Sequence, residues 1–591
     1  MLARVDGQDL PVIAAGSTVG APGKNGAVLA ALTTDRPGWS VQLLADDGTA
    51  IGEQERVDAE RIAALETEHH PRWIWNDTLT TYPALLAAGV RLDRCHDIVM
   101  TERILLAREG RFGEPAAAAA VEARRLGHPV PEDLAEDLPS AVPVLFDTHT
   151  HTPDPGVDLP ALVNAYLDQL SRVATAAAGR PGEDIAVDPG ALRLLIAADS
   201  ACALVAAEMG RFGMPWQPDV HDRILTEKLG ARPAPGERPP KMAVLAAQIN
   251  DAFGFPVNPD SAVDLRGAFR RAGFELETTR SWVIKEVDHP AVPAVLAYKE
   301  LSRLHSANGW NWLTEWVRDG RFRADYVPAG VVTGRWATKG GGALQIPKVV
   351  RSAVVAEPGF CLVVADAAQL EPRVLVAVSG DEKLAALAGD DDLYVGLAEI
   401  GFSGDRSKAK LAMLGAMYGQ TSGEAGRLVA TLRASFPAAM ACVETAARRG
   451  EQGRLVTTVL GRTSNPPSAA WTEIVDTGAG PEASAAVERR GRQVARDRGR
   501  FTRNFIIQGS AADWAAVWLS TLRQSLRQVP GAELVFFQHD ELMVHCPAEQ
   551  GEQVARMVTE AADTARRLVF PHGRARTPVR PLVVKCYADA K

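Results

Sequence analysis

Acidic side chains far apart in the chain end or interrupt runs of strand-forming residues. Asp366 follows the apolar run "CLVVA", and "ELVFFQHDELMVHC" (533–546) places Asp540 and Glu541 between two further apolar runs. A polar turn within an apolar hairpin is often structural, but a second acid at a strand end favours a site. Two carboxylates about 4 Å apart repel by roughly 4 kcal/mol at a protein-like dielectric, so they need a shared proton or cations. Carboxylates with substrate phosphates suit Mg²⁺, so these acids predict a metal site.

A second pattern sets cations and an aromatic ring along one helix. In "DRSKAKLAMLGAMYGQ" (405–420), Arg406, Lys410, Leu414 and Tyr418 recur every four residues behind the capping residue Asp405. They therefore lie along one stripe of a helix. Such a stripe alone is usually a solvated face. The combination Arg-x3-Lys-x7-Tyr-Gly, however, is expected by chance in only about one in a hundred chains of this length.

The elements that must position these residues divide the chain into several parts. Its 591 residues exceed what one hydrophobic core usually supports, so two to four domains are expected. Strand-like and helix-like runs alternate up to about residue 185, the pattern of an α/β layer domain. Gly and Pro mark a linker near 178–190. The chain is mainly helical from there to about 320, and strands separated by helices return after 330.

Composition and charge exclude several classes of protein. The net charge of −9 means that a nucleic-acid surface, if present, must be local. The six cysteines lack Cys-x-x-Cys spacing, which argues against a zinc knuckle or a disulfide framework and fits a reducing cytoplasm. No signal peptide and no uninterrupted run of about 18 apolar residues is present, so neither secretion nor membrane spanning is expected.

One segment concentrates positive charge. A solvated helical face and a phosphate-binding surface explain it equally well on composition alone. Its arginines are Arg448, Arg449, Arg454, Arg462, Arg489, Arg490, Arg492, Arg496, Arg498, Arg500 and Arg503.

Five segments, in order, resemble the motifs of the family A DNA polymerases, the bacterial DNA polymerase I type. "DAAQLEPRVL" (366–375) resembles Asp-Tyr-Ser-Gln-Ile-Glu-Leu-Arg, and "RSKAKLAMLGAMYG" (406–419) resembles Arg-x3-Lys-x3-Phe-x3-Tyr-Gly. "QHDEL" (538–542) resembles Val-His-Asp-Glu-Leu. "TGRWATKGGGALQIP" (333–347) is similar to the Thr-Gly-Arg segment, and "RFTRNFIIQGSAADW" (500–514) to Arg-x3-Asn-x3-Gln-Gly-x-Ala-Ala-Asp. The likeness runs from about residue 190 to the C-terminus.

The resemblance implies a fold. Residues 190–591 would form an α+β right-hand polymerase domain, with a thumb at about 190–320, a palm at about 321–382 and 504–591, and fingers at about 383–503. Residues 1–185 would form an α/β, ribonuclease H-like 3′–5′ exonuclease domain. No 5′ nuclease domain is expected within this length.

The resemblance also implies site residues. Asp366 and Asp540 would hold two Mg²⁺ ions, or Mn²⁺ in their place, with the backbone carbonyl of Ala367 as a further ligand and Glu541 in support. Lys410 and Arg406 would grip the incoming triphosphate. The nucleotide site would also contain Leu414, Tyr418 near the templating base, Glu371 against the sugar 2′ position, Gln369 and His539. Primer or template would contact Arg335, Arg462, Arg500, Asn504 and Gln508.

The chain departs from the family pattern at several positions. Ala367 and Ala368 stand where the family has Tyr-Ser, a change that a backbone metal ligand tolerates. Leu414 replaces the usual aromatic residue, so the resemblance does not carry over the family's sugar and dideoxynucleotide discrimination at this position. Pro372 is tolerable only in the first turn of its helix.

The acids of an active exonuclease are not found in the first domain. Its first strand offers "ALTTD" without Asp-x-Glu, and Tyr82 falls where a metal-binding Asp is expected. Asp97 lies in a matching context, whereas Asp58 and Glu60 have the Asp-x-Glu spacing in a helical stretch. A vestigial domain without proofreading is therefore expected.

Three other classes of protein share part of this pattern. "FDTHTHTPD" (146–154) resembles the opening of amidohydrolases, which need further metal ligands on later strands. His221, His289 and His305 occur in helical or loop contexts, so His149 and His151 are interpreted as loop residues. A catalytically silent DNA-binding protein would have lost Asp366, Asp540 or Lys410. Single-subunit phage RNA polymerases share these residues, but Glu371 favours deoxynucleotides.

The expected protein is a monomeric, cytoplasmic DNA polymerase. It would act at the nucleoid on primer-template DNA and dNTPs, in repair or replication, with no membrane partner.

Overall fold

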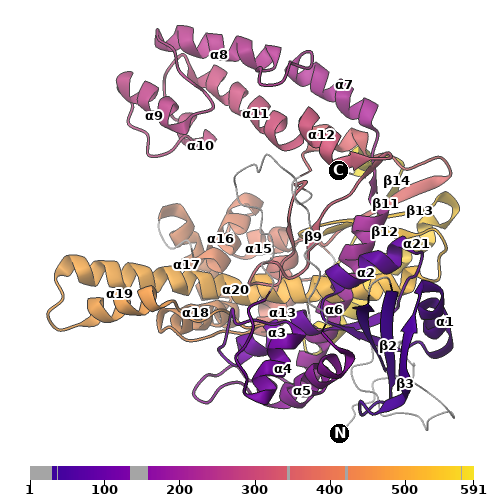
Figure 1. The fold of residues 1–591 in the computed structure, drawn as a ribbon. Coiled ribbons are helices and arrows are strands. Elements are labelled where there is room, and N and C mark those ends of the chain that lie inside the picture. Colours follow the sequence, from indigo (N-terminus) through magenta and orange to yellow (C-terminus); the bar gives the residue numbers. More distant parts are fainter. Residues whose placement is uncertain are drawn as a thin grey trace.

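The computed structural model describes residues 29–35, 38–133, 157–342, 346–389, 391–419, 423–573 and 575–590. The histidine-containing stretch 146–154 lies outside the described residues. An α/β domain, a long helical projection and a sheet-containing body follow one another along the chain (Figure 1).

The N-terminal domain is a five-stranded sheet covered by helices. The strands are β1 (Leu29–Asp35), β2 (Gly38–Leu44), β3 (Ala50–Val57), β4 (Arg72–Trp75) and β5 (Arg94–Asp97), in the order β3-β2-β1-β4-β5. β2 runs antiparallel to β1 and β3, while β1, β4 and β5 are parallel. The helices are α1 (Ala59–His69), α2 (Thr78–Ala87), α3 (Ile98–Arg108), α4 (Ala118–Leu126) and α5 (Leu159–Ala178).

Alternation along β4 divides the core of this domain between the two faces of the sheet. Trp73 and Trp75 pack in one hydrophobic cluster with Tyr82, and Ile74 packs in another with Leu162. This is the two-residue period of a strand whose faces are both buried. The expected α/β layer arrangement is confirmed for this part of the chain.

Helix α6 (Pro189–Phe212) joins the N-terminal domain to the rest of the protein. Asp188 caps its first turn by accepting hydrogen bonds from the backbone N–H of Gly190 and Ala191. By length and composition α6 could cross a membrane, but 67% of its most apolar window is buried inside the protein. It contacts α2, β5, β12 and α20, so it is a core helix. The expected thumb start near residue 190 coincides with the start of α6, which packs against both the N-terminal domain and the body.

The projection consists of helices that extend over the body at the top of Figure 1. They are α7 (Pro218–Leu229), α8 (Pro240–Phe253), α9 (Ala262–Arg271), α10 (Ser281–Ile284), α11 (Val292–Asn308) and α12 (Trp310–Trp316). An aromatic cluster of Trp216, Trp312 and Phe322 anchors them, beside the short strands β6 (Met214–Pro215), β7 (Val317–Arg318) and β8 (Arg321–Phe322).

The histidines weighed for a hydrolase belong to the packing of this projection. His221 is buried and its Nε2 lies 2.9 Å from the Asn308 carbonyl oxygen. His289 stacks on Phe253, and His305 packs edge-on against Trp310. Within the described ranges none of the three belongs to a group of residues that could hold a metal ion, which removes the support for an amidohydrolase.

The body contains an antiparallel sheet in the order β12-β13-β11-β14. Its strands are β11 (Phe360–Asp366), β12 (Glu533–Gln538), β13 (Glu541–Pro547) and β14 (Leu582–Val584). Helices α20 (Ala485–Leu526) and α21 (Gly551–Val569) pack together, and the Trp518 indole N–H donates to the Val558 carbonyl at 3.1 Å. Smaller elements are β9 (Tyr326–Val327), β10 (Ala337–Thr338) and the 3₁₀ turns Lys348–Ala353, Ala548–Gln550 and Tyr587–Ala590.

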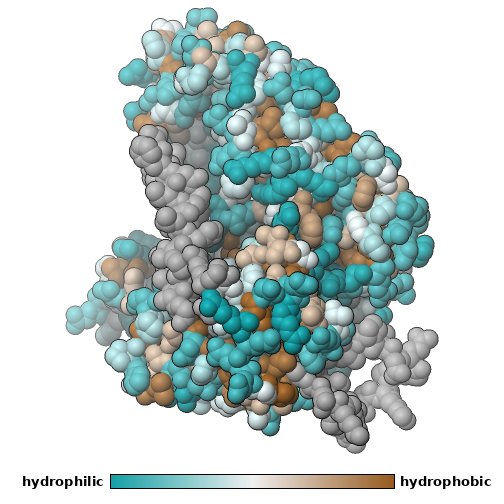
Figure 2. Space-filling view, turned by 45° about the vertical axis from the view of Figure 1, so that its right-hand side comes forward, coloured by the Kyte–Doolittle hydropathy of each residue, from teal (hydrophilic) through white to brown (hydrophobic). Residues whose placement is uncertain are grey.

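A helical region lies between β11 and β12 in the sequence. It comprises α13 (Leu370–Ser379), α14 (Glu382–Leu387), α15 (Leu393–Gly401), α16 (Arg406–Tyr418), α17 (Gly423–Ser435), α18 (Pro437–Glu451), α19 (Ala469–Ala479) and the first half of α20. Because α20 is one continuous helix of 42 residues, the expected boundary between fingers and palm at 503/504 falls inside it. The face of the molecule in Figure 2 is mostly hydrophilic, with hydrophobic residues in small scattered groups.

Candidate functional site

The two strands expected to carry the acids are neighbours in one sheet. Asp366, the last residue of β11, pairs directly with Glu541, the first residue of β13. The backbone N–H of Ala367 donates to the Asp540 carbonyl at 3.0 Å. Asp366 and Asp540 are partly exposed, whereas Glu541 is buried. The structure thus brings together acids that are more than 170 residues apart in the sequence.

A two-residue turn places Asp540 beside β11. β12 ends at Gln538, which pairs with Glu541, so His539 and Asp540 alone form the hairpin loop. His539 has φ +58°, in the left-handed region that non-glycine residues seldom occupy. Such a conformation persists only where the surrounding structure imposes it, and it is typical of functional sites.

Tyr587 is a neighbour of these acids that no sequence pattern singles out. Its ring is buried, and burial together with the nearby Glu541 carboxylate raises the pKa of its hydroxyl. The hydroxyl therefore stays protonated and can donate a hydrogen bond to Glu541. Its motif, "CYADAK", carries no pattern that points to the site.

A second group of predicted residues surrounds Glu371, in the first turn of α13. The Tyr418 hydroxyl donates to Glu371 Oε2 at 2.6 Å, and Arg335 forms an ion pair with Glu371 Oε1. Burial, reinforced by the Glu371 hydrogen bond, raises the pKa of Tyr418 to about 12. Burial and the Arg335 charge lower the pKa of His539. A small pocket beside this group is lined by Gly334, Arg335, Trp336, Ala512, Ala515, Phe537 and His539.

The turn that leads into α13 has a further left-handed residue. Gln369 has φ +56°, and its side-chain amide donates to Asp392 Oδ1 at 2.6 Å. Pro372 lies in the first turn of α13, as a proline within a helix requires. The Gln369 side chain thus connects the start of α13 to Asp392, which caps α15.

Arg406 and Lys410 occupy the predicted stripe on α16, but Arg406 already has an anionic partner. Its Nε and Nη2 donate to Asp392 Oδ2 at 2.9 and 2.7 Å, and its guanidinium lies over the Tyr394 ring. Although burial raises it, the hydrogen bonds from Arg406 and Gln369 hold the pKa of Asp392 below its usual value. Lys410 is exposed one turn further along α16.

The residues expected to contact primer or template follow one another along α20. Arg500 is exposed, and a Cβ atom added at Gly419 would lie 2.9 Å from its Cγ. Asn504 and Gln508 are half-buried further along the helix, and the Gln508 side chain is hydrogen-bonded to Tyr418. They thus line the side of the site where α16 meets α20.

Arg462 does not belong to this surface, and its predicted contact with DNA is wrong. Its Nη2 donates to Asp199 Oδ1 at 2.9 Å and its Nε to Asp513 Oδ1 at 2.8 Å. All three side chains are buried, and the Thr458 hydroxyl donates to the other Asp513 oxygen at 2.5 Å. Arg462 neutralises two carboxylates that would otherwise be buried without a counter-ion.

In the N-terminal domain, Asp97 and Tyr82, the residues expected near the metal-binding positions of an exonuclease, make hydrogen bonds within the protein. The Asp97 carboxylate caps α3 through the Met100 N–H at 2.9 Å and accepts the Thr78 hydroxyl at 2.7 Å. Burial and the neighbouring Asp77 raise its pKa to about 7. The Tyr82 hydroxyl donates to Glu208 of α6 at 2.8 Å. These contacts connect the domain internally and to α6.

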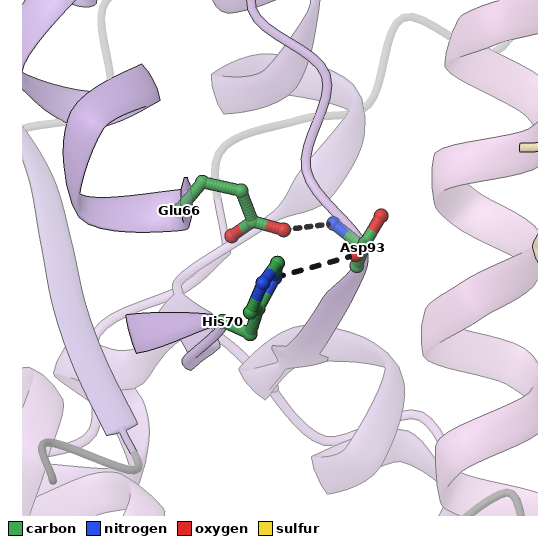
Figure 3. A group of neighbouring side chains, drawn as sticks. All are labelled: Glu66, His70 and Asp93. Carbon is green, nitrogen blue, oxygen red and sulfur yellow. Dashed lines mark hydrogen bonds and ion pairs between the residues drawn. The ribbon is translucent and has the colours of Figure 1, made fainter. Parts of the chain in front are cut away.

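One group of side chains in this domain has metal-ligating geometry. One ligand atom from each of Glu66, His70 and Asp93 lies within 4.8 Å of the others (Figure 3). Both Glu66 oxygens already accept hydrogen bonds, from the Trp73 indole at 2.7 Å and the Asp93 N–H at 2.8 Å. Both carboxylate oxygens of the buried Glu66 therefore have hydrogen-bond donors within the protein.

A family model described as DNA polymerase family A matches residues 240–572. The chain is 29% identical to the thermostable DNA polymerase I of Thermus filiformis over 311 residues, which are 48% of this chain and 35% of that protein. It is 28% identical to DNA polymerase I of Chloroflexus aurantiacus over 356 residues, which are 55% of this chain and 35% of that protein. The chain thus spans about a third of the length of these relatives.

A solved structure shares the fold over nearly the whole chain. It is described as the POL domain of Pol1 from M. smegmatis in complex with DNA primer-template and dNTP. The TM-score is 0.66 with 17% sequence identity, and 95% of each chain is covered. The N-terminal α/β domain lies within this similarity, because 5% of the chain is far shorter than that domain.

Proposed function

Because the chain belongs to DNA polymerase family A, we propose that it is a template-directed DNA polymerase that adds deoxynucleotides to a primer 3′ end. The observation that carries the proposal is the meeting of Asp366, Asp540 and Glu541 at one edge of the β11–β13 pair. The similarity of the fold to a polymerase domain solved with primer-template and dNTP supports these substrates.

The donor set at this edge fits a pair of hard divalent cations. Asp366 and Asp540 are partly exposed and offer carboxylate oxygens, and Ala367, next to Asp366, offers a backbone carbonyl. Oxygen donors with room for water and phosphate ligands suit Mg²⁺, and Mn²⁺ accepts the same ligands. When bound, two such ions would activate the primer 3′-hydroxyl and neutralise charge on the triphosphate. The buried Glu541 supports this edge through its pairing with Asp366.

The remaining residues of the site bind and select the nucleotide. Arg406 and Lys410 present positive charge to the triphosphate along one stripe of α16. Glu371, held between Arg335 and Tyr418, occupies the position against the sugar 2′ carbon and excludes ribonucleotides. Leu414 lies on the same stripe as Tyr418 and replaces an aromatic residue, so sugar discrimination rests mainly on Glu371.

The contacts to nucleic acid are assigned to residues around Tyr418. Tyr418 lies near the templating base. Arg335 and His539, which line one pocket, contact the primer side. Arg500, Asn504 and Gln508 contact the template along α20.

The N-terminal domain is a degenerate ribonuclease H-like 3′–5′ exonuclease domain. Its mixed sheet supports this assignment, and Asp97 and Tyr82 are occupied in structural hydrogen bonds. A mismatched primer should therefore not be trimmed in the presence of Mg²⁺. Metal-dependent 3′ trimming would contradict this part of the proposal.

The protein acts as a cytoplasmic monomer at the nucleoid, in repair or replication.

Primer extension tests the proposal. Asp540→Asn should lower single-nucleotide incorporation by at least about 100-fold, because an electrostatic contact made at the reacting phosphate is lost. Asp563→Asn removes an exposed acid of α21 and is the matched control, which should extend like the wild type. Full activity in Asp540→Asn would refute the proposed reaction. Tight primer-template binding without extension by the wild type would instead indicate a catalytically silent DNA-binding protein.

A further inference from the structure

Two classes of arginine can be distinguished within the segment 448–503, while Arg490 is exposed on another face of α20. Arg449 pairs with Glu183 and Asp184, and Arg462 is buried. The second class lies along α20, ahead of the candidate site, and is here called the arginine ladder. It consists of Arg489, Arg492, Arg496 and Arg500, all exposed.

The ladder occupies one face of α20. At about 100° per residue, these four side chains fall within a sector of about 80°. The opposite face is covered: Gly491 packs against Gly478 of α19 so closely that an added Cβ would lie 3.1 Å from the Gly478 Cα. Arg498, on the same side as Gly491, is buried, and its Nη2 donates to the Asn465 carbonyl at 2.9 Å. These contacts therefore fix which side of this part of α20 faces solvent.

The charges of the ladder are available to an anion. Within the part of the chain that the structure describes, no ion pair involves Arg489. Arg492 pairs with Glu488 and Arg500 with Asp497, and all four of these side chains are about half exposed. Exposed ion pairs contribute about 0–1 kcal/mol, so a phosphate, which guanidinium binds with two parallel hydrogen bonds, can replace the carboxylate. Because the whole protein carries a net charge of −9, this local row stands out against an acidic background.

The ladder begins at the candidate site and leads away from the sheet. Arg500 lies against Gly419, the residue after Tyr418. The C-terminal half of α20 packs against α6 and α21, whereas its N-terminal half extends with α19 to the left in Figure 1. From Arg489 to Arg500 the helix rises about 16 Å, which matches about five stacked nucleotides of one strand.

We propose that the arginine ladder binds the phosphates of the unpaired template strand before it enters the site. This inference rests on the proposed polymerase function. A single row of cations along one helix can follow one backbone, which favours a single strand over a duplex. The sugar-phosphate backbone of the 5′ overhang is the occupant, and no base-specific contact is implied.

Binding measurements on two substrates test the ladder. Fluorescence anisotropy would compare primer-templates whose 5′ overhang is one nucleotide or about 12 nucleotides, between about 50 and 200 mM salt. The test variant is Arg489→Ala/Arg496→Ala. The control variant, Arg556→Ala/Arg567→Ala, removes two exposed charges from α21. Alanine is at least as good a helix former as arginine, so folding is retained.

The expected change appears only with the long overhang. Each phosphate contact on a single strand adds about 0.7 to the slope of log affinity against log salt, so the test variant should lose about 1.4. Between 50 and 200 mM salt, the wild type should then lose about sevenfold more affinity for the long overhang than the variant does. The control variant should keep the wild-type slope, and the one-nucleotide substrate should not distinguish test variant from control.

Each other result contradicts the proposal that the arginine ladder binds the unpaired template strand. Equal losses on both substrates would mean that the arginines hold duplex DNA, and no loss on either would mean a solvated face. The same loss in the control would indicate a general effect of net charge. Binding is measured without dNTP, so the two proposals can fail separately. A protein that shows the slope difference but extends no primer would support strand binding by the arginine ladder and contradict the proposed polymerase function.

Discussion

Replacing Arg462 by methionine should destabilise the protein without weakening DNA binding directly. The substitution keeps a long side chain but removes the cation between Asp199 and Asp513, which are buried. Asp513 keeps only its hydrogen bond from Thr458 among the contacts of this group. Removing one partner of a buried ion pair costs about 3–5 kcal/mol, because a charge is left without compensation.

The expected loss can be expressed as a melting temperature. With an unfolding entropy of about 2.1 cal/mol/K per residue, a chain of 591 residues that unfolds as one unit loses about 3 °C for 4 kcal/mol. A smaller cooperative unit would lose more. Differential scanning calorimetry at neutral pH measures this shift. Arg454→Met, an exposed arginine of the same segment, is the matched control and should change stability by less than about 0.5 kcal/mol.

Two further results decide the role of Arg462. Asp199→Asn in the Arg462→Met background should restore part of the stability, because one uncompensated charge is removed. Primer-template affinity, measured well below the melting temperature, should stay near that of the wild type. An Arg462→Met protein with unchanged melting temperature and weakened DNA binding would refute the assignment of Arg462 to a buried network.

Three other outcomes follow from contacts in the structure. Asp392→Asn keeps the helix cap but weakens the hold on Arg406, so KM for dNTP should fall by up to about fivefold in steady-state incorporation; a raised KM would contradict this role. Glu371→Ala should lower the preference for dCTP over CTP by at least about tenfold, and an unchanged ratio would exclude Glu371 as the sugar filter. Burial lowers the pKa of His96 to about 4, below its unfolded value of 6.5, so the folded state resists protonation. Neutral His96 therefore contributes about 3 kcal/mol to the free energy of unfolding above pH 6.5, and this contribution is lost as pH falls toward 4. The free energies of unfolding of the wild type and His96→Asn should converge on acidification, and parallel curves would refute this.

Sequence patterns predicted those features of the site that depend on residues close together in the chain. The four-residue spacing from Arg406 to Tyr418 predicts α16, and Asp405 caps it as expected. The acids at the strand ends were expected to meet if their strands share a sheet, and β11 does pair with β13, with Asp366 opposite Glu541. In both cases the signal is a period or a strand end that neighbouring residues already contain.

Partners that are distant in the sequence could not be predicted. Arg462 follows a glycine in an arginine-rich segment, and nothing local distinguishes it from an exposed cation. Its burial depends on Asp199 of α6 and Asp513 of α20, which only the tertiary fold brings together. For the same reason the sequence did not show that Asp392 binds Arg406, since their contact crosses from α15 to α16.

The divisions implied by the resemblance do not all fall between secondary-structure elements. It implied a thumb from about residue 190, where α6 begins, and a boundary between fingers and palm at 503/504, which lies inside α20. In the structure, Glu208 of α6 accepts from Tyr82 of the N-terminal domain and from Arg523 of α20, so α6 is shared between domains. A helix that serves two cores at once carries no break in its own sequence.

Counting bound ions tests the central claim most directly, namely that Asp366 and Asp540 hold divalent cations together. Electron paramagnetic resonance can measure the Mn²⁺ bound to the protein in the presence of primer-template and a non-hydrolysable dNTP analogue. The wild type and Asp563→Asn should bind two ions at the site, and Asp366→Asn/Asp540→Asn should lose both. Retention of two tightly bound ions by the double variant would contradict the account.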